Sequence, residues 1–306
     1  MTIATIAIGV SLTSAYPAGD PRVGARMMIE RAAAARRADL DSLFVGDHHA
    51  TPGPYYQNVP IMGRLLAEWG DKPAGCLFLL PLWNPVLLAE QVGTLASIAR
   101  GRFILQTGLG DDEAQFLAMG ASLKTRPSAF EEALIAIRRL LAGDSVSAAG
   151  RFTFENARVA LRPAEPIDVW IGATANVAID RAARLGDAWL ASPGLIPAAA
   201  AAKNTLYRER CVAHGRVPTA IAIRRDVYVG ESTAEAAETL AQVVARGYRG
   251  FDPAALVAGD VEQVVGQFQA LAGMGYTDVI VRHLINDHAK VLASFARLGE
   301  VRRSLS

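Results

Sequence analysis

Residues 84–120 decide the fold, and they read NPVLLAEQVGTLASIARGRFILQTGLGDDEAQFLAMG. Apolar residues recur at a period near 3.6 over 86–98, which predicts an amphipathic helix. Pro85 suits the first turn of that helix, and Gly101 suits a left-handed stop just past its end. The apolar run 103–106 then predicts a strand that is covered on both faces.

That strand is followed by a glycine-broken loop that opens another helix. Glycine lets backbone N–H groups approach a ligand closely, and a helix N-terminus favours anions. The same spacing also occurs in plain tight turns, so the loop alone does not establish a binding site. The candidate cofactor contacts in this loop are Thr107, Gly108, Leu109 and Gly110.

Strand and helix patterns alternate on both sides of this stretch. We predict strands at 2–12, 41–46, 75–80, 103–106, 167–171, 188–191, 220–229 and 278–282, and helices at 21–37, 58–69, 85–100, 126–142, 176–185, 197–214, 234–246, 261–274 and from 287. Residues 143–166 interrupt the alternation of strands and helices, and their pattern predicts an exposed hairpin insertion. Eight strands alternating with helices predict an α/β fold, a (β/α)8 TIM barrel forming one domain over 1–306.

The composition predicts a soluble protein with a large hydrophobic core. The 306 residues are 51% hydrophobic and carry a net charge of +1, which argues against nucleic-acid or membrane-surface partners. Cys76 and Cys211 lack metal or redox spacing, and the histidines include no ligand-spaced set, so we predict no metal site. With neither a signal peptide nor a membrane-spanning stretch, the sequence favours a reduced, cytoplasmic protein.

The C-terminal ends of barrel strands carry the chemistry in this fold. Asp47, His48 and His49 end the second strand, and histidine can carry a proton near neutral pH while an adjacent carboxylate fixes its tautomer or raises its pKa. A helix cap or a supporting hydrogen-bond network is the alternative. Tyr16, Tyr55, Tyr56 and Trp83 are candidates to line an apolar substrate pocket, with Tyr55 and Tyr56 on a lid-like loop.

A second candidate phosphate loop follows the strand 167–171. It contains Gly172, Ala173, Thr174 and Ala175 ahead of a helix, although Thr174 would also serve as an ordinary N-cap. Arg224 and Arg282 lie on the seventh and eighth strands, where an arginine among apolar residues needs a partner. Ion pairs with nearby aspartates are an equally simple explanation, and Glu113 and Arg126 are interpreted as architectural.

The spacing of Pro85, LAEQ at 88–91, GRF at 101–103 and QF at 115–116 resembles the luciferase-like monooxygenase family. That family includes FMN-dependent relatives of bacterial luciferase and oxidoreductases that use the deazaflavin F420. The resemblance continues through DSLFVGDHH at 41–49, through Arg126, and through 169–172 and 182–189. It covers residues 1 to about 195 well and the remaining third more loosely.

The resemblance implies roles for several residues. His48 or His49 would lie beside the cofactor ring and handle a proton, and a strained or cis backbone near Leu80 would support the ring, unless Leu80 and Trp83 simply pack under the barrel rim. Many FMN-binding members carry a phosphate-gripping arginine where this chain has Leu109, which weakens the FMN interpretation. Arg282 would meet the phosphate or tail of a deazaflavin.

The predicted function is therefore a flavin- or deazaflavin-dependent oxidoreductase acting on a small organic substrate. It would use either reduced FMN with oxygen, supplied by a partner reductase, or F420. Leu109 favours F420 and the histidine pair favours luciferase proper. The rivals are a non-catalytic barrel acting as a subunit, which the retained histidines argue against, and a flavin-free phosphate-binding enzyme. The apolar helices 58–69 and 85–100 predict a homodimer.

Overall fold

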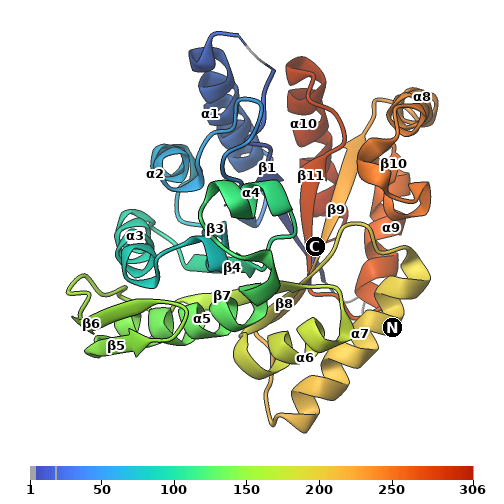
Figure 1. Cartoon of the computed structure of the whole chain (residues 1–306). Coiled ribbons are helices and arrows are strands. Elements are labelled where there is room, and N and C mark those ends of the chain that lie inside the picture. The colour runs from blue at the N-terminus through green and yellow to red at the C-terminus, as the bar shows by residue number, and fades with distance from the viewer. Residues whose placement is uncertain (1–4, 18, 306) are drawn as a thin grey trace.

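A computed structural model describes residues 5–17 and 19–305, and in this part of the chain eight parallel strands close into a barrel (Figure 1). The pairing of β8 with β9 closes the ring. The short strand β10 pairs in parallel with the C-terminal end of β9, beside the barrel. The barrel strands are β1 (Ala7–Leu12), β2 (Ser42–Val45), β3 (Ala74–Leu79), β4 (Phe103–Gly108), β7 (Asp168–Ala173), β8 (Ala188–Ala191), β9 (Ala220–Val229) and β11 (Asp278–His283), with β10 at Val257–Gly259. The predicted TIM barrel is confirmed.

Helices surround the strands, and a hairpin lies outside the ring beside α5 (Figure 1). Its strands β5 (Val146–Ala149) and β6 (Thr153–Ala157) are antiparallel, as predicted for the insertion. The helices are α1 (Pro21–Arg37), α2 (Asn58–Trp69), α3 (Pro85–Ile98), α4 (Glu113–Ala118), α5 (Arg126–Ala142), α6 (Asn176–Leu185), α7 (Pro197–Ala213), α8 (Thr233–Ala245), α9 (Val261–Gly273) and α10 (His288–Ser304). No helix of the described residues is long and apolar enough to cross a membrane.

The barrel axis is filled by side chains from alternate strand positions. The rings of Phe44 and Trp170 lie 5.7 Å apart at their centroids, and alanines leave room for them. This inner cluster comprises Phe44, Ile104, Trp170, Ala188, Ala220, Ala222 and Ile280. Because these residues occupy the centre, a ligand of the barrel has to lie above them, at the carboxyl ends of the strands.

Helix boundaries follow local capping chemistry. The Asp20 carboxylate accepts from the Arg22 N–H ahead of Pro21, and Gly143 ends α5 in the left-handed conformation. Asp260 and Gln263 form a reciprocal capping box at the start of α9. The observed bounds of α1, α2, α5 and α6 match those predicted, and at the start of α1 and the end of α5 these local signals account for the agreement.

The prediction that Gly101 ends α3 in a left-handed conformation is wrong. The helix ends at Ile98, the next residue Ala99 has an extended backbone, and Gly101 does not have a positive φ. A Cβ on Gly101 would instead lie 2.2 Å from the carbonyl oxygen of Asp71 and 2.7 Å from that of Lys72. Glycine is required there because another segment of backbone approaches closely, which no local pattern reveals.

Other boundaries differ by a few residues. β1 begins at Ala7, and part of its predicted start, 2–4, lies outside the described residues. β4 continues to Gly108, whereas β3 ends at Leu79 and gives way to a 3₁₀ turn, Leu80–Leu82. β10 was not predicted, because a three-residue strand leaves almost no periodic signal.

The apolar character of α2 is explained by the chain's own core. Ile61, Met62, Leu65 and Leu66 are all buried within the protomer, whereas α3 leaves Leu87 and Ile98 about half exposed. A homodimer through this region stays a prediction, and α3 is the helix that still offers apolar surface for it.

We expect Gly101→Ala to lower the free energy of unfolding by about 1–3 kcal/mol, because the backbone has to shift to admit the methyl group. Gly266→Ala in α9 is the matched control. In the described chain no heavy atom beyond its own helix lies within 4 Å of that added methyl, and alanine should raise stability by about 0.5–1 kcal/mol. Urea unfolding measures both, and equal stability of the two variants would contradict the close approach at Gly101.

Candidate functional site

A cavity of about 410 Å³ opens at the carboxyl ends of β3, β4, β7, β8 and β9. The two loops predicted to contact a cofactor line this one cavity, and its size lies in the range of small-molecule sites. The lining residues are Leu77, Leu79, Thr107, Gly108, Leu109, Gly110, Asp111, Arg126, Gly172, Ala173, Thr174, Ala175, Ala178, Leu190, Ala191, Ser192, Pro193 and Arg224.

The two loops combine an apolar wall with accessible backbone. Gly110 has φ +72°, a conformation that a side chain would strain, and a Cβ on Gly172 would lie 3.2 Å from the Thr107 carbonyl oxygen. Thr174 does not cap α6, because the N-cap is Ala175 and no side chain bonds to the first amides of this helix. The alternative interpretation of Thr174 as an ordinary N-cap is therefore wrong. The uncapped N-terminus of α6 borders the cavity and suits an anion.

Two arginines bring positive charge to this cavity, and Arg282 is not one of them. Arg126 donates from Nη1 to the Leu123 carbonyl oxygen at 3.0 Å, while its buried Nε has no partner among the described residues. Arg224 lies across the cavity on β9. Arg282 lies on β11, where its Nη2 is 3.4 Å from Thr13 Oγ1. The sequence interpretation of Arg126 as architectural missed its place on the cavity wall.

The buried carboxylate of Asp47 joins three elements. It accepts from the Leu79 backbone N–H at 2.8 Å, from the Trp83 indole at 2.9 Å and from Asn58 Nδ2 at 3.3 Å. Asn58 also donates to the Leu77 carbonyl oxygen at 2.7 Å. The side chain of Asp47 is fully enclosed, so it positions the groups around it rather than contacting a ligand.

The two histidines after Asp47 have different surroundings. His49 Nε2 lies 3.2 Å from Asp47 Oδ1, in contact but outside hydrogen-bond geometry, and its ring packs against Trp83. His48 is the more exposed residue and contacts Tyr55 edge to face at 5.4 Å. Partial burial of its ring lowers the pKa of His48, and Arg282 and Arg249 lower it further, against Asp47 and Asp111. His48 therefore favours the neutral form and can accept a proton.

Of the tyrosines predicted to line a substrate pocket, Tyr55 contacts the candidate catalytic residue His48. Its burial raises the pKa of its phenol to about 12. Tyr16 and Tyr56 pack against each other and against α1 instead: Tyr16 accepts from Arg31 at 3.2 Å, and Tyr56 donates to the Pro21 carbonyl oxygen. The hydroxyl groups of these two rings are thus engaged by α1.

Leu80 lies in the main core with no exposed surface, whereas its neighbour Leu79 lines the cavity. All peptide bonds of the described residues are trans. Trp83, placed by the turn Leu80–Leu82, reaches Asp47 and packs against Phe78 and His49.

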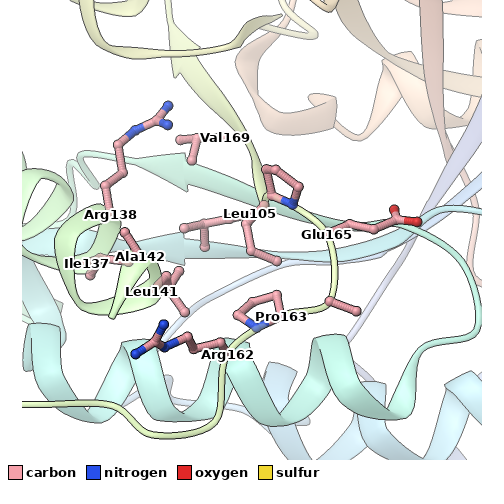
Figure 2. Close-up of a pocket in the computed structure, with 12 residues that line it drawn as sticks. Leu105, Ile137, Arg138, Leu141, Ala142, Arg162, Pro163, Glu165 and Val169 are labelled. Atoms are coloured by element: carbon pink, nitrogen blue, oxygen red, sulfur yellow. The ribbon is translucent and has the colours of Figure 1, made fainter. Parts of the chain in front are cut away.

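A second cavity, of about 440 Å³, lies outside the barrel (Figure 2). Figure 2 shows Ile137, Arg138 and Leu141 of α5 on one side of it, and the segment with Pro163 and Glu165 on another. None of the predicted site residues lines it. Across residues 5–17 and 19–305, no cluster of three or more His, Cys, Asp or Glu side chains could hold a metal ion.

Comparison with known proteins gives consistent results. The family model described as luciferase-like monooxygenase matches residues 6–273. An F420-dependent glucose-6-phosphate dehydrogenase of Intrasporangium calvum is 28% identical over 192 residues, which is 58% of this chain and 57% of that protein. The same enzyme of Kribbella flavida is 27% identical over 195 residues, 60% and 58% of the two chains. The match thus spans under three fifths of these relatives.

Solved structures support the same fold. Monooxygenase RslO1 from Streptomyces bottropensis superimposes with a TM-score of 0.85 at 19% identity, covering 96% of this chain and 98% of that one. The F420-dependent tetrahydromethanopterin reductase of Methanopyrus kandleri gives 0.76 at 17% identity, covering 97% and 98%. At these identities the likeness shows the fold alone.

We expect Asp47→Ala to lower the free energy of unfolding by about 3 kcal/mol, because it leaves buried N–H donors of β3, α2 and Trp83 unpaired. Trp83→Phe removes one donor and should cost about 1 kcal/mol. Chemical denaturation followed by circular dichroism measures both. Similar small losses in the two variants would show that Asp47 does not hold these elements together.

Proposed function

Because this chain belongs to the luciferase-like monooxygenase family, we propose that it is an oxidoreductase that holds a deazaflavin or flavin in the mouth of its barrel. The observation that carries the proposal is the meeting of two glycine-containing loops and a proton-accepting histidine at one end of the barrel. F420 is the preferred cofactor, and a small alcohol is the preferred substrate.

The residues present fit such a cofactor. Leu77, Leu79 and Leu190 provide an apolar wall for a planar ring, and the backbone at 108–110 and 173–175 offers N–H groups to a phosphate. Arg126 supplies a cation beside these loops, with a buried Nε that has no partner in the described chain. When bound, a deazaflavin would supply the acceptor for a hydride.

F420 is favoured over FMN by two observations. Leu109 offers no charge from the position where many FMN-binding members carry arginine, and the curated relatives quoted above are named for F420. Those relatives are dehydrogenases, which supports oxidation of an alcohol as the reaction. Arg126 favours the second candidate, a monooxygenase that uses reduced FMN from a partner reductase, since it could replace the missing phosphate ligand.

His48 acts as the base in this proposal. It stands at the mouth beside Tyr55, and its lowered pKa leaves the imidazole neutral near pH 7. It accepts the hydroxyl proton of the substrate as the alcohol carbon is oxidised to a carbonyl. Asp47 positions the loop that carries His48, and Gln57 Nε2 fixes its backbone by donating to the His48 carbonyl oxygen at 3.0 Å.

We expect His48→Asn to lower turnover by about 10²–10⁴-fold, the usual contribution of a general base. Cofactor binding, measured by filtration with FMN and with F420, should change little. His49→Asn is the matched control and should affect turnover less, because His49 packs against Trp83 and Asp47. Full turnover of His48→Asn would remove the base from the proposal. Failure of the unmodified protein to bind either cofactor would favour the flavin-free or non-catalytic alternatives.

In this proposal, protonation of His48 determines how the activity depends on pH. Only the neutral imidazole accepts a proton, so activity is present above the pKa of His48 and is lost as pH falls through it. Since burial holds that pKa below its ordinary value of 6.5, the acidic limb of kcat/KM should lie below pH 6.5. A limb at higher pH, or one retained in His48→Asn, would point to another group.

Substitutions that remove a backbone N–H group can test where the cofactor phosphate binds. Thr174→Pro removes one N–H, whereas Thr174→Ala keeps it, so the proline variant should lose more cofactor affinity. Arg126→Ala should weaken binding by about 1.5–3 kcal/mol, the cost of one charged hydrogen bond. Calorimetric titration with F420 and FMN measures both effects, and unchanged binding in Thr174→Pro and Arg126→Ala would move the phosphate elsewhere.

A further inference from the structure

Three arginines surround one buried carboxylate where β9 and β11 reach the mouth. Arg224 Nε lies 3.2 Å from Asp226 Oδ1, and Arg249 Nη1 lies 3.4 Å from Oδ2. Arg282 of β11 stands beside Asp226 of β9 in the register of the two strands. We name Arg224, Arg249 and Arg282 the arginine cluster.

The cluster carries more positive charge than its surroundings neutralise. The guanidinium groups of Arg224 and Arg249 lie within 4 Å of the single carboxylate of Asp226, which also accepts from the Tyr248 hydroxyl at 2.9 Å, and Arg282 adds a third cation on the neighbouring strand. Arg282 forms no ion pair within 4 Å in the described part of the chain. Burial lowers the pKa of Arg224 to about 10, and the charges of Arg282 and Arg249 act in the same direction. Concentrating cations in a half-buried site is unfavourable unless an anion joins them.

The other carboxylates near the mouth do not remove this excess. Asp47 is occupied by three N–H donors and by His49, and Asp111 lines the cavity on the β4 side. Both raise the pKa of His48, but burial and the two arginines prevail, so the net shift is downward. Burial is the largest cause of that shift, and Arg282 and Arg249 act against the raising effect of Asp47 and Asp111.

The backbone that carries Arg249 is held in an unusual conformation. Arg249 has φ 49° and lies between Gly247 at φ 69° and Gly250 at φ 65°. A residue other than glycine seldom adopts this region without compensation. The loop is anchored on Asp226 through Tyr248 and Arg249, and the guanidinium of Arg249 lies 5.0 Å over the ring of Phe251. These contacts keep the third positive charge at the mouth.

We propose that the arginine cluster binds an anionic group of the substrate, a phosphate ester or a carboxylate, and so presents the rest of the molecule to His48. Arg224 lines the cofactor cavity, and Arg249 and Arg282 adjoin it through Asp226, by an ion pair and by strand register respectively, so the cluster borders the cavity at the β9–β11 side of the mouth. This inference names the substrate class for the proposed function and rests on it. The phosphate of the cofactor is assigned to the loops 108–110 and 173–175, and the cluster borders the same cavity through Arg224 on β9.

The first experiment titrates the full chain with inorganic phosphate and, separately, with acetate, at constant ionic strength. We expect saturable binding of at least one anion, weakened about tenfold or more in Arg249→Ala and in Arg282→Ala. Arg139→Ala is the control, because Arg139 is exposed on α5 and pairs with Asp144. Phosphate binding alone indicates a phosphate ester and acetate binding alone a carboxylate. Binding of neither anion, or equal loss in the control, would overturn the proposal.

The second experiment follows the His48 ring by NMR. A bound anion offsets the charges of Arg282 and Arg249, so saturation with the binding anion should raise the pKa of His48. In the same preparations, binding of F420 and FMN should be unchanged in Arg249→Ala and Arg282→Ala. A tenfold loss of cofactor affinity in those variants, or an unmoved His48 titration, would show that the cluster does not serve the substrate. Cofactor binding by the unmodified chain tests the proposed function separately.

Discussion

The mouth of the barrel depends on the buried carboxylate of Asp47. A charge removed from water has to be matched by donors, and here the backbone of β3, the indole of Trp83 and the amide of Asn58 supply them. Each donor comes from a different part of the chain, so the carboxylate fixes the end of β2, the turn after β3 and the start of α2 together. These bonds restrain the loop that carries His48, because moving Asp47 would leave the donors unpaired.

Successive side chains of a strand point to opposite faces of the sheet, and this alternation decides where the charged residues of β9 lie. Arg224 and Asp226 point to the barrel interior, whereas the intervening Arg225 points outward and donates to the Pro193 carbonyl oxygen at 3.2 Å. One short sequence, Arg-Arg-Asp, therefore supplies a structural contact on one face of the sheet and an electrostatic feature of the mouth on the other. The strand needs no irregularity to achieve this.

Much of this arrangement follows from sequence, and the remainder has identifiable causes. The eight strands, the hairpin insertion and the meeting of the loops after β4 and β7 could be predicted, since parallel strand ends share one rim. The reason for Gly101, the place of Arg126 on the cavity wall and the bond from Tyr56 to Pro21 could not be predicted. Each is set by segments that lie far away in the sequence, namely Asp71, the other strands around the cavity and α1. The unequal roles of His48 and His49 likewise emerge only when Trp83 and Tyr55 are placed around them.

The side chains that fill the barrel axis also affect the order in which molecules enter and leave its mouth. Phe44, Trp170 and Ile280 close the interior below the cavity, so molecules reach the site from the rim. Leu77 and Leu190 line the deeper apolar cavity, whereas Arg249 and His48 stand nearer to solvent. A planar ring seated against the leucines would be covered by any molecule held at the arginines. Under the proposed function, such a site would have an ordered sequential kinetic mechanism in which the deeper molecule enters first and departs last.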